Sequence, residues 1–163
     1  RLLEGSVDRA ADQQLFFTAQ IVNWILGAID GHAKNYSVFL GPGGFRMTPL
    51  YDILSAAPAM ASNGFRHKDL RLAMSVGRRN HYRLDQIQPR HFDQSALRAR
   101  VAPDTRRQAF ARIVAAGLPA VERVANALPA GFPERVSGPI LEHARNRLEL
   151  LIRQAEAGQI VVH

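Results

Sequence analysis

Apolar residues recur at helical spacing through the first part of the chain. Between Ser6 and Gly27 the sequence is rich in helix formers, and apolar positions three or four residues apart share one helix face. Ser6 and Asp8 are both suitable N-caps, and Gly27 is a suitable end. The pattern predicts one long buried helix with an inner face of Leu15, Thr18, Val22, Ile25 and Ile29.

A β-hairpin is predicted next. Residues 36–40 are mostly apolar, residues 45–48 alternate, and the Gly-Pro-Gly-Gly sequence at 41–44 is strong turn chemistry. The hairpin would return the chain to Asp52. Beyond it the pattern is weak: an irregular loop or one short helix over 53–64, a short strand or apolar turn over 70–76, and a polar link over 77–84.

The second half of the chain is helical in pattern. Apolar periodicity, prolines and acidic residues at helix starts predict helices at about 89–101, 104–128 and 133–157, with a break in the second at Gly117-Leu118-Pro119. The fold class is therefore mainly α, a helical bundle with one small β-hairpin. With 163 residues and no shift in composition, residues 1–163 are expected to form a single domain.

Composition excludes several classes of protein. The chain has no cysteine, which excludes disulfide scaffolds, thiolate zinc sites, iron–sulfur clusters and cysteine nucleophiles, and favours a cytoplasmic location. No apolar run approaches the roughly 20 residues of a membrane span, so no membrane partner is expected. Because the chain does not begin with Met, we expect a fragment of a longer protein.

The chain is basic, with 21 Lys and Arg against 14 Asp and Glu, a net charge of +7. This balance favours a polyanionic partner, such as ATP phosphates, nucleic acid or an acidic protein surface, without choosing among them. The arginines are spread over the second half of the chain, so most are better explained as a solvated helical surface.

Three oxygen-bearing side chains form the main candidate site. Asp30 and Asn35 are five positions apart after the buried helix, and the hairpin brings Asp52 back beside them. Carboxylate and amide oxygens suit Mg²⁺, which substrate phosphates commonly complete. An Asp base, an Asn five residues later, a hairpin and a second Asp are also the order of the catalytic and metal loops of protein kinases.

Each of these residues alone is more often a turn former than a ligand. As a trio flanking a hairpin, with His32 and Lys34 between them, they favour the kinase interpretation. His32 could donate a hydrogen bond to the transferred phosphate or could orient Asp30, and the sequence does not choose. No His pair has metal spacing and no Ser has a Gly-x-Ser-x-Gly context, so a zinc site and a serine hydrolase are unsupported.

Residues 23–39 (NWILGAIDGHAKNYSVF) and 48–56 (TPLYDILSA) closely resemble the C-terminal lobe of HipA, the serine/threonine kinase toxin of bacterial toxin–antitoxin pairs. The likeness continues thinly through 69–74, 89–92 and 132–134. The resemblance implies a fold like a protein-kinase C-lobe, with Asp30 as the catalytic base assisted by His32. It implies that Asn35 and Asp52 bind Mg²⁺, and that Asp30, Lys34, Asn35 and Asp52 bind the cofactor ATP.

The partners implied by the resemblance are a HipB-like helix-turn-helix antitoxin, operator DNA through the antitoxin complex, and glutamyl-tRNA synthetase as the protein substrate. The sequence lacks a Gly-rich phosphate loop and a strand lysine, so we expect these residues not to include the nucleotide lobe and the isolated chain to be inactive or nearly so. Two alternatives stay open: a lipid or small-molecule kinase, and a non-catalytic remnant that binds antitoxin or operator DNA. For the latter, Arg98 and Arg100 are candidate phosphate contacts.

Overall fold

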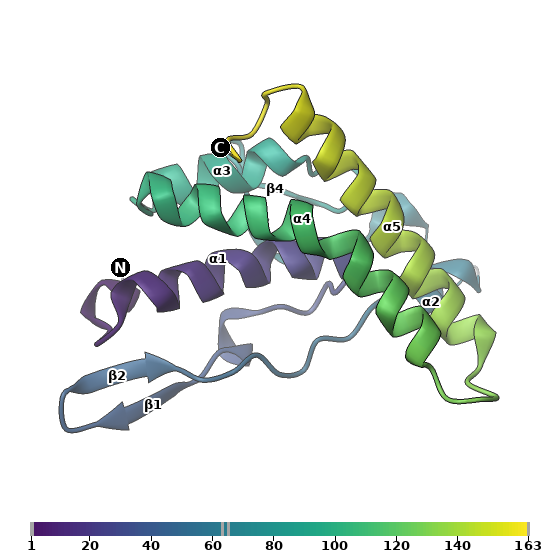
Figure 1. The fold of residues 1–163 in the computed structure, drawn as a ribbon, viewed down its shortest axis with the longest axis horizontal. Coiled ribbons are helices and arrows are strands. Elements are labelled where there is room, and N and C mark those ends of the chain that lie inside the picture. Colours follow the sequence, from purple (N-terminus) through teal and green to yellow (C-terminus); the bar gives the residue numbers. More distant parts are fainter. Residues whose placement is uncertain (1, 63, 65, 163) are drawn as a thin grey trace.

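The structure is a computed structural model, and it describes residues 2–62, 64 and 66–162. Helices dominate, as predicted, and two short antiparallel strand pairs accompany them (Figure 1). The helices are α1 (Arg9–Leu26), α2 (Ala57–Ala61), α3 (Pro89–Arg98), α4 (Pro103–Ala127) and α5 (Glu134–Glu156), with 3-10 turns η1 (Leu2–Gly5), η2 (Ala33–Asn35) and η3 (His67–Asp69). The strands are β1 (Val38–Gly41), β2 (Gly44–Met47), β3 (Arg71–Val76) and β4 (His81–Arg83).

Helix α1 begins and ends where the sequence predicts. The Asp8 carboxylate accepts a hydrogen bond from the Ala11 amide at 3.2 Å, and Gly27 ends the helix in the left-handed conformation, φ 63°. The predicted inner face is partly wrong. The buried positions centre on Phe17, Ile21 and Trp24, whereas Leu15, Thr18 and Val22 are half-buried. Helices packed on more than one side of α1 rotate the buried face away from the simplest apolar stripe.

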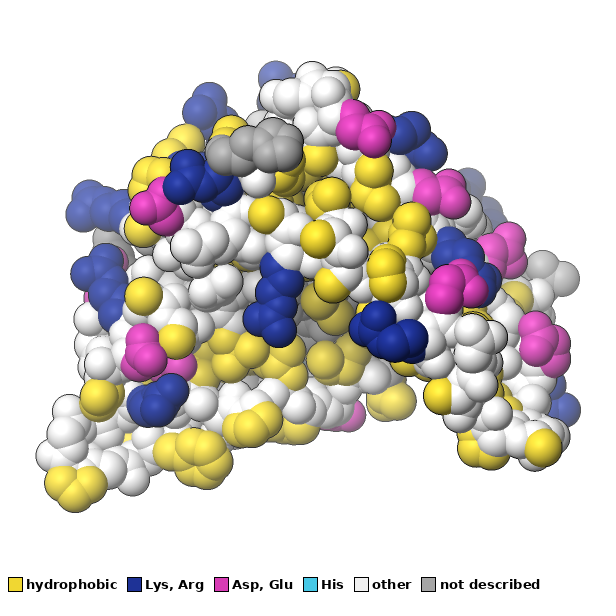
Figure 2. All heavy atoms as spheres, in the orientation of Figure 1, with side chains coloured by type: hydrophobic (Ala, Val, Ile, Leu, Met, Phe, Trp, Pro, Cys, Tyr) yellow, Lys and Arg dark blue, Asp and Glu magenta, His cyan; other side chains and the backbone are white. Residues whose placement is uncertain are grey.

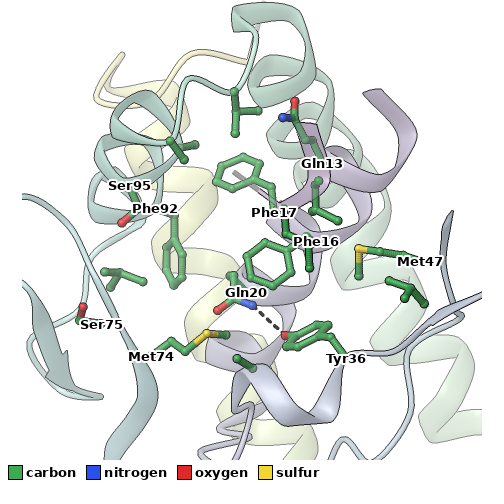
Figure 3. Close-up of a pocket in the computed structure, with 18 of the residues that line it drawn as sticks. Gln13, Phe16, Phe17, Gln20, Tyr36, Met47, Met74, Ser75, Phe92 and Ser95 are labelled. Atoms are coloured by element: carbon green, nitrogen blue, oxygen red, sulfur yellow. Dashed lines mark hydrogen bonds between the residues drawn. The ribbon is translucent and has the colours of Figure 1, made fainter. Parts of the chain in front are cut away.

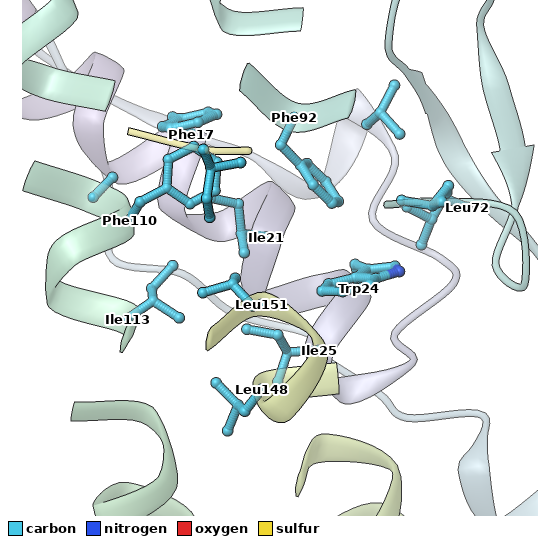
Figure 4. Close-up of a cluster of buried hydrophobic side chains, with 14 of the residues drawn as sticks. Phe17, Ile21, Trp24, Ile25, Leu72, Phe92, Phe110, Ile113, Leu148 and Leu151 are labelled. Carbon is cyan, nitrogen blue, oxygen red and sulfur yellow. The ribbon is translucent and has the colours of Figure 1, made fainter. Parts of the chain in front are cut away.

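The hydrophobic core lies where α1, α3, α4 and α5 meet (Figure 4). The Phe17 ring meets the edge of Phe110 at a centroid distance of 5.4 Å, and Trp24 lies 5.7 Å from Phe92. The Arg147 guanidinium lies 5.0 Å from the centre of the Trp24 ring. Trp24 is therefore a core residue.

The predicted break in the second long helix is wrong, because α4 runs without interruption through Gly117 and Pro119. Proline removes one helical hydrogen bond, but Pro119 and the carbonyl-bearing Ala115 four residues earlier are both exposed, so water can satisfy the carbonyl. Gly117 has a packing role: a Cβ added there would collide with Leu148 of α5. Glycine and proline in this helix accommodate a neighbour and solvent without ending it.

The hairpin is confirmed with slightly different bounds. Strands β1 and β2 pair from Val38 with Met47 to Gly41 with Gly44. The buried carboxylate of Asp12 on α1 accepts hydrogen bonds from the Met47 amide at 2.8 Å and the Ser6 hydroxyl at 2.5 Å. The hairpin stands to one side of the helices (Figure 1) and is attached to α1 by these polar contacts.

Four other segments refine or correct the predictions. The loop after Asp52 contains one short helix, α2, and residues 71–76 form a strand, so in each case the structure selects one of two predicted options. Strand β4 was not predicted, because its three residues lie in a polar stretch. Helix α3 ends three residues early, where Arg100 takes a positive φ of 58° and the Val101 amide bonds back to the Ala96 carbonyl.

The surface agrees with a dispersed basic charge. On the face drawn in Figure 2, Lys and Arg side chains are scattered among neutral and acidic ones and form no continuous patch. In the described part of the chain, no helix combines the length and the apolar character that crossing a bilayer requires.

Candidate functional site

The loop that follows α1 carries the first two predicted site residues. Its course is fixed by backbone hydrogen bonds, from the Ala28 amide to the Asn23 carbonyl at 2.7 Å and from the Ala73 amide to the Ile29 carbonyl at 2.9 Å. The second bond joins the loop to strand β3. Asp30 therefore leaves the helical body at a defined point and projects into solvent.

Asn35 is held against the start of the same loop. Its Nδ2 donates a hydrogen bond to the Asp30 carbonyl at 2.9 Å, across the 3-10 turn η2. The amide nitrogen is thereby used for the loop, and the amide oxygen, the atom that a cation would take, is on the other arm of the group. This bond closes the loop from Asp30 to Asn35.

His32 lies beside Asp30. Its Nε2 is 3.3 Å from the Asp30 Oδ1, and both side chains are largely exposed. This is the contact that an orienting role would use. The role of His32 stays a prediction. Lys34, in the turn between them, is also exposed and is outside the residues that line the small cavity described next.

Asp52 lies in the return segment after the hairpin and has an unusual backbone. Its φ is 55°, in the left-handed region that residues other than glycine, asparagine and aspartate rarely adopt. Such conformations persist only where the surroundings impose them, and they concentrate at functional sites. Aspartate tolerates this conformation better than most residues, and the fold selects it at Asp52.

The three predicted residues meet at one small cavity. Asp30, Asn35 and Asp52 all line it, together with Asn23, Gly31, Tyr36 and residues 50–54, among others, and its volume is about 20 Å³. The expectation that the hairpin brings Asp52 back to the Asp30–Asn35 loop is thus met. Within the described residues, no group of three His, Cys, Asp or Glu side chains could hold a metal. A cation here would need the Asn35 oxygen in addition to a carboxylate, with the remaining ligands from water or a substrate.

Arg98 and Arg100 lie elsewhere, at the end of α3. Both are exposed, and the Arg98 Nη1 donates to the Asn80 Oδ1 at 3.4 Å. The structure does not bring them to the cavity that Asp30 lines. Their contact with nucleic-acid phosphates stays a prediction.

The sequence analysis missed the residues that support the loop. Gln20 and Asn23 on α1 donate side-chain hydrogen bonds to the Tyr36 hydroxyl at 2.7 and 3.3 Å. Burial raises the pKa of this phenol, although the two amide donors act in the opposite direction. The hydroxyl therefore stays protonated. Two amide side chains three residues apart on one helix were a usable signal, because they share a face.

A larger cavity, of about 420 Å³, was also missed (Figure 3). It lies between α1, the hairpin, β3 and α3, and its walls are mostly apolar, including Phe16, Phe17, Met74 and Phe92. Tyr36 lines both cavities and points its hydroxyl at Gln20. Tyr36, the residue after Asn35, thus separates the small polar cavity from the larger apolar cavity.

Comparison with known proteins assigns the family. The sequence pattern of the HipA-like C-terminal domain matches residues 1–124, most of the chain. This chain belongs to the HipA-like family. The resemblance stated on residues 23–39 and 48–56 is confirmed.

The chain matches known relatives over only part of their length. A Sinorhizobium fredii protein named "Putative kinase Y4mE" is 35% identical over 72 residues, which is 43% of this chain and 15% of that protein. The HipA of Shewanella oneidensis MR-1, solved with HipB and operator DNA, matches in fold with a TM-score of 0.68 at 20% identity, over 96% of this chain and 34% of that one. This HipA-like chain thus spans about a third or less of each relative.

Proposed function

We propose that this chain supplies the catalytic loops of a HipA-type kinase, which transfers the γ-phosphate of Mg-ATP to a serine or threonine hydroxyl of a protein. One observation carries the proposal: Asp30, Asn35 and Asp52, separated by a hairpin in sequence, line one small cavity. Their order along the chain is that of kinase catalytic and metal loops. The kinase name of the Sinorhizobium relative supports the reaction class.

Asp30 is the proposed base. Its carboxylate accepts the proton of the acceptor hydroxyl while that oxygen bonds to the γ-phosphorus and the bond to the ADP oxygen breaks. The exposed carboxylate is open to a protein substrate, and the His32 Nε2 at 3.3 Å orients it. Lys34, exposed in the same loop, is proposed to meet the nucleotide phosphates.

The residues present fit Mg²⁺. Asn35 and Asp52 line the same cavity, and the bond from the Asn35 Nδ2 to the Asp30 carbonyl directs the amide nitrogen away from the ligand role. Two protein oxygens, with waters and phosphates, are a usual magnesium environment. Charge neutralisation on the transferring phosphoryl group is the chemistry that a bound Mg²⁺ supplies.

The activity belongs to the whole HipA-like protein in this proposal. The chain covers 34% of the solved Shewanella HipA, so the proposed reaction is assigned to the complete protein and not to these 163 residues. We expect the 163-residue chain by itself to transfer little or no phosphate. Glutamyl-tRNA synthetase, the substrate that the family resemblance implies, is the first acceptor to test.

A HipB-like antitoxin and operator DNA are the proposed partners. The Shewanella HipA was solved with both, and the fold likeness covers nearly all of this chain. The exposed Arg98 and Arg100 are the proposed phosphate contacts, and the same surface would serve a chain that retained binding but had lost catalysis. A chain of that kind would still bind the antitoxin complex after substitution of its Asp30.

The test separates binding from chemistry in the complete protein that contains this chain. Asp52→Asn should weaken Mg-ATP binding, because it removes a metal ligand. Asp30→Asn should leave nucleotide binding nearly intact and lower the transfer rate by 100-fold or more, about the contribution of a general base. Equal loss of nucleotide binding in both variants would contradict the assigned roles.

A further inference from the structure

Each proposed magnesium ligand has a tyrosine next to it in sequence. Tyr36 follows Asn35 directly and Tyr51 precedes Asp52 directly. The hydroxyl of Tyr36 is bonded to helix α1, and the hydroxyl of Tyr51 lies 2.7 Å from the Ser37 Oγ. Hydrogen bonds therefore connect the helix to the first loop, and the first loop to the second.

The Tyr36 end of this connection is anchored in the helical body. Gln20 and Asn23 both donate to its hydroxyl, and its ring lies 4.9 Å from that of Phe16. Asn23 is buried, with 6% of its surface exposed, and it also limits the other end of the loop, because a Cβ added to Gly31 would collide with its Nδ2. One amide on α1 thus contacts both Gly31, inside the Asp30–Asn35 loop, and Tyr36, directly after it.

The Tyr51 end holds a strained residue between two fixed points. Before Asp52, the Tyr51 hydroxyl is bonded to Ser37. After it, the Ser55 hydroxyl donates to the Leu26 carbonyl at 2.5 Å, and the Ala56 amide donates to the Gly27 carbonyl at 3.0 Å. The positive φ of Asp52 is the conformation that must fit between these two attachments.

We propose that Tyr36 and Tyr51 are positioning residues that fix the distance between the side-chain oxygens of Asn35 and Asp52. The inference rests on the proposed function. Its physical reason is that Mg²⁺ and Mn²⁺ need oxygen ligands in a narrow octahedral geometry, so two exposed loops must be ordered before a cation can bridge them. When one tyrosine hydroxyl is removed, the cation itself must order the loop that the hydrogen bond had ordered. The affinity of the site for the cation therefore falls.

The experiment is a Mn²⁺ titration of the 163-residue chain without nucleotide, followed by paramagnetic broadening of backbone amide NMR signals. Tyr36→Phe and Tyr51→Phe each remove one hydroxyl and keep the ring. Tyr82→Phe is the matched control, because Tyr82 is an exposed tyrosine on β4, outside both cavities. Ser37→Ala, alone and with Tyr51→Phe, removes the partner of the exposed bond. Thermal unfolding and the unbroadened amide spectrum confirm that each variant is folded.

We expect broadening centred on Asp30, Asn35 and Asp52, with an affinity about three- to tenfold weaker in Tyr36→Phe and Tyr51→Phe and unchanged in Tyr82→Phe. Ser37→Ala and the double variant should match Tyr51→Phe, because they break the same bond. Localised binding with equal affinity in all tyrosine variants would overturn the positioning inference and leave the proposed function standing. Absence of localised broadening in the unsubstituted chain would overturn the proposed metal site, and the inference with it.

Discussion

The helical body and the hairpin with its two loops are held by different forces. In the body, Ile21, Trp24, Phe110 and Leu151 have essentially no exposed surface, and packing of such side chains is the main stabilising contribution. In the hairpin every residue of β1 is exposed. Hydrogen bonds from α1 and its carboxyl end hold the hairpin and loops instead. Because hydrogen bonds hold the loops of the site, single substitutions can change the geometry of the site without disturbing the hydrophobic core.

The largest expected effect is in the core. Phe110→Ala should lower the free energy of unfolding by about 3–5 kcal/mol, because Phe110 is fully buried and packs edge-on against Phe17. Leu40→Ala, on the 84% exposed Leu40 of the hairpin, should change it by less than about 0.5 kcal/mol. Urea unfolding measures both. A large loss in Leu40→Ala would mean that the hairpin contributes to the core.

The attachment of the hairpin to α1 should show the next largest effect. Asp12→Ala removes the acceptor of the Met47 amide and the Ser6 hydroxyl and should cost about 2–3 kcal/mol. Amide hydrogen exchange should rise in β1 and β2 more than in α4 and α5. Asp69→Ala, which breaks the exposed ion pair with Arg66, is the control and should leave hairpin exchange unchanged. Uniform exchange through the whole chain in Asp12→Ala would show that hairpin and body unfold as one unit.

A pH-dependent change of about 2 kcal/mol in the free energy of unfolding should come from His91, in helix α3 of the helical body. Burial, with the nearby His81 and Arg90, lowers the pKa of His91 to about 4 from the ordinary 6.5. The unfolded chain therefore takes up this proton first as the pH falls, so stability is full above pH 6.5 and declines between pH 6.5 and 4. The value of about 2 kcal/mol is the loss of unfolding free energy expected between pH 7 and pH 5.

His91→Gln tests that origin of the pH dependence. The Gln88 amide donates a hydrogen bond to the His91 Nδ1 at 3.2 Å. The substitution removes the titrating ring but retains a side-chain acceptor for this amide. Unfolding free energy in this variant should be flatter between pH 7 and 5. An unchanged slope would assign the acid sensitivity to other groups.

The smallest effect is expected at Asp52, where strain and site coincide. Asp52→Gly relieves the positive φ and should change stability by no more than about 1 kcal/mol, in the stabilising direction if strain outweighs the added freedom of the unfolded chain. The same change should abolish Mn²⁺ binding. Denaturation and metal titration on one sample separate the two outcomes. A large destabilisation would mean that the carboxylate has a structural role.

Local patterns predicted that Asp30, Asn35 and Asp52 meet, but they did not predict the contacts that support these residues. The turn at 41–44 and the helix end at Gly27 are encoded by neighbouring residues, and together they place Asp30, Asn35 and Asp52 near one cavity. The bond from the Met47 amide to the Asp12 carboxylate joins positions 35 apart, and the bond between Ser37 and Tyr51 joins positions 14 apart. Periodicity within one element contains no information on such pairs.

The same limit explains the errors in the fold. A break at Pro119 is the local expectation, but the exposed position of Ala115 and the close packing of Gly117 on Leu148 let α4 continue. The inner face of α1 was misplaced because several helices pack on it, and the arrangement of those helices is not visible in the helix's own sequence. Long-range packing thus decided what local propensity could not.

Phosphate transfer by the complete protein that contains this chain, measured with γ-labelled ATP and Mg²⁺, tests the central claim most directly. The unsubstituted protein, and not the Asp30→Asn variant, should label a serine or threonine of a protein acceptor such as glutamyl-tRNA synthetase, while both bind Mg-ATP. Label transfer that persists at an unchanged rate in Asp30→Asn would contradict the account, because the proton would then be accepted by a group other than Asp30.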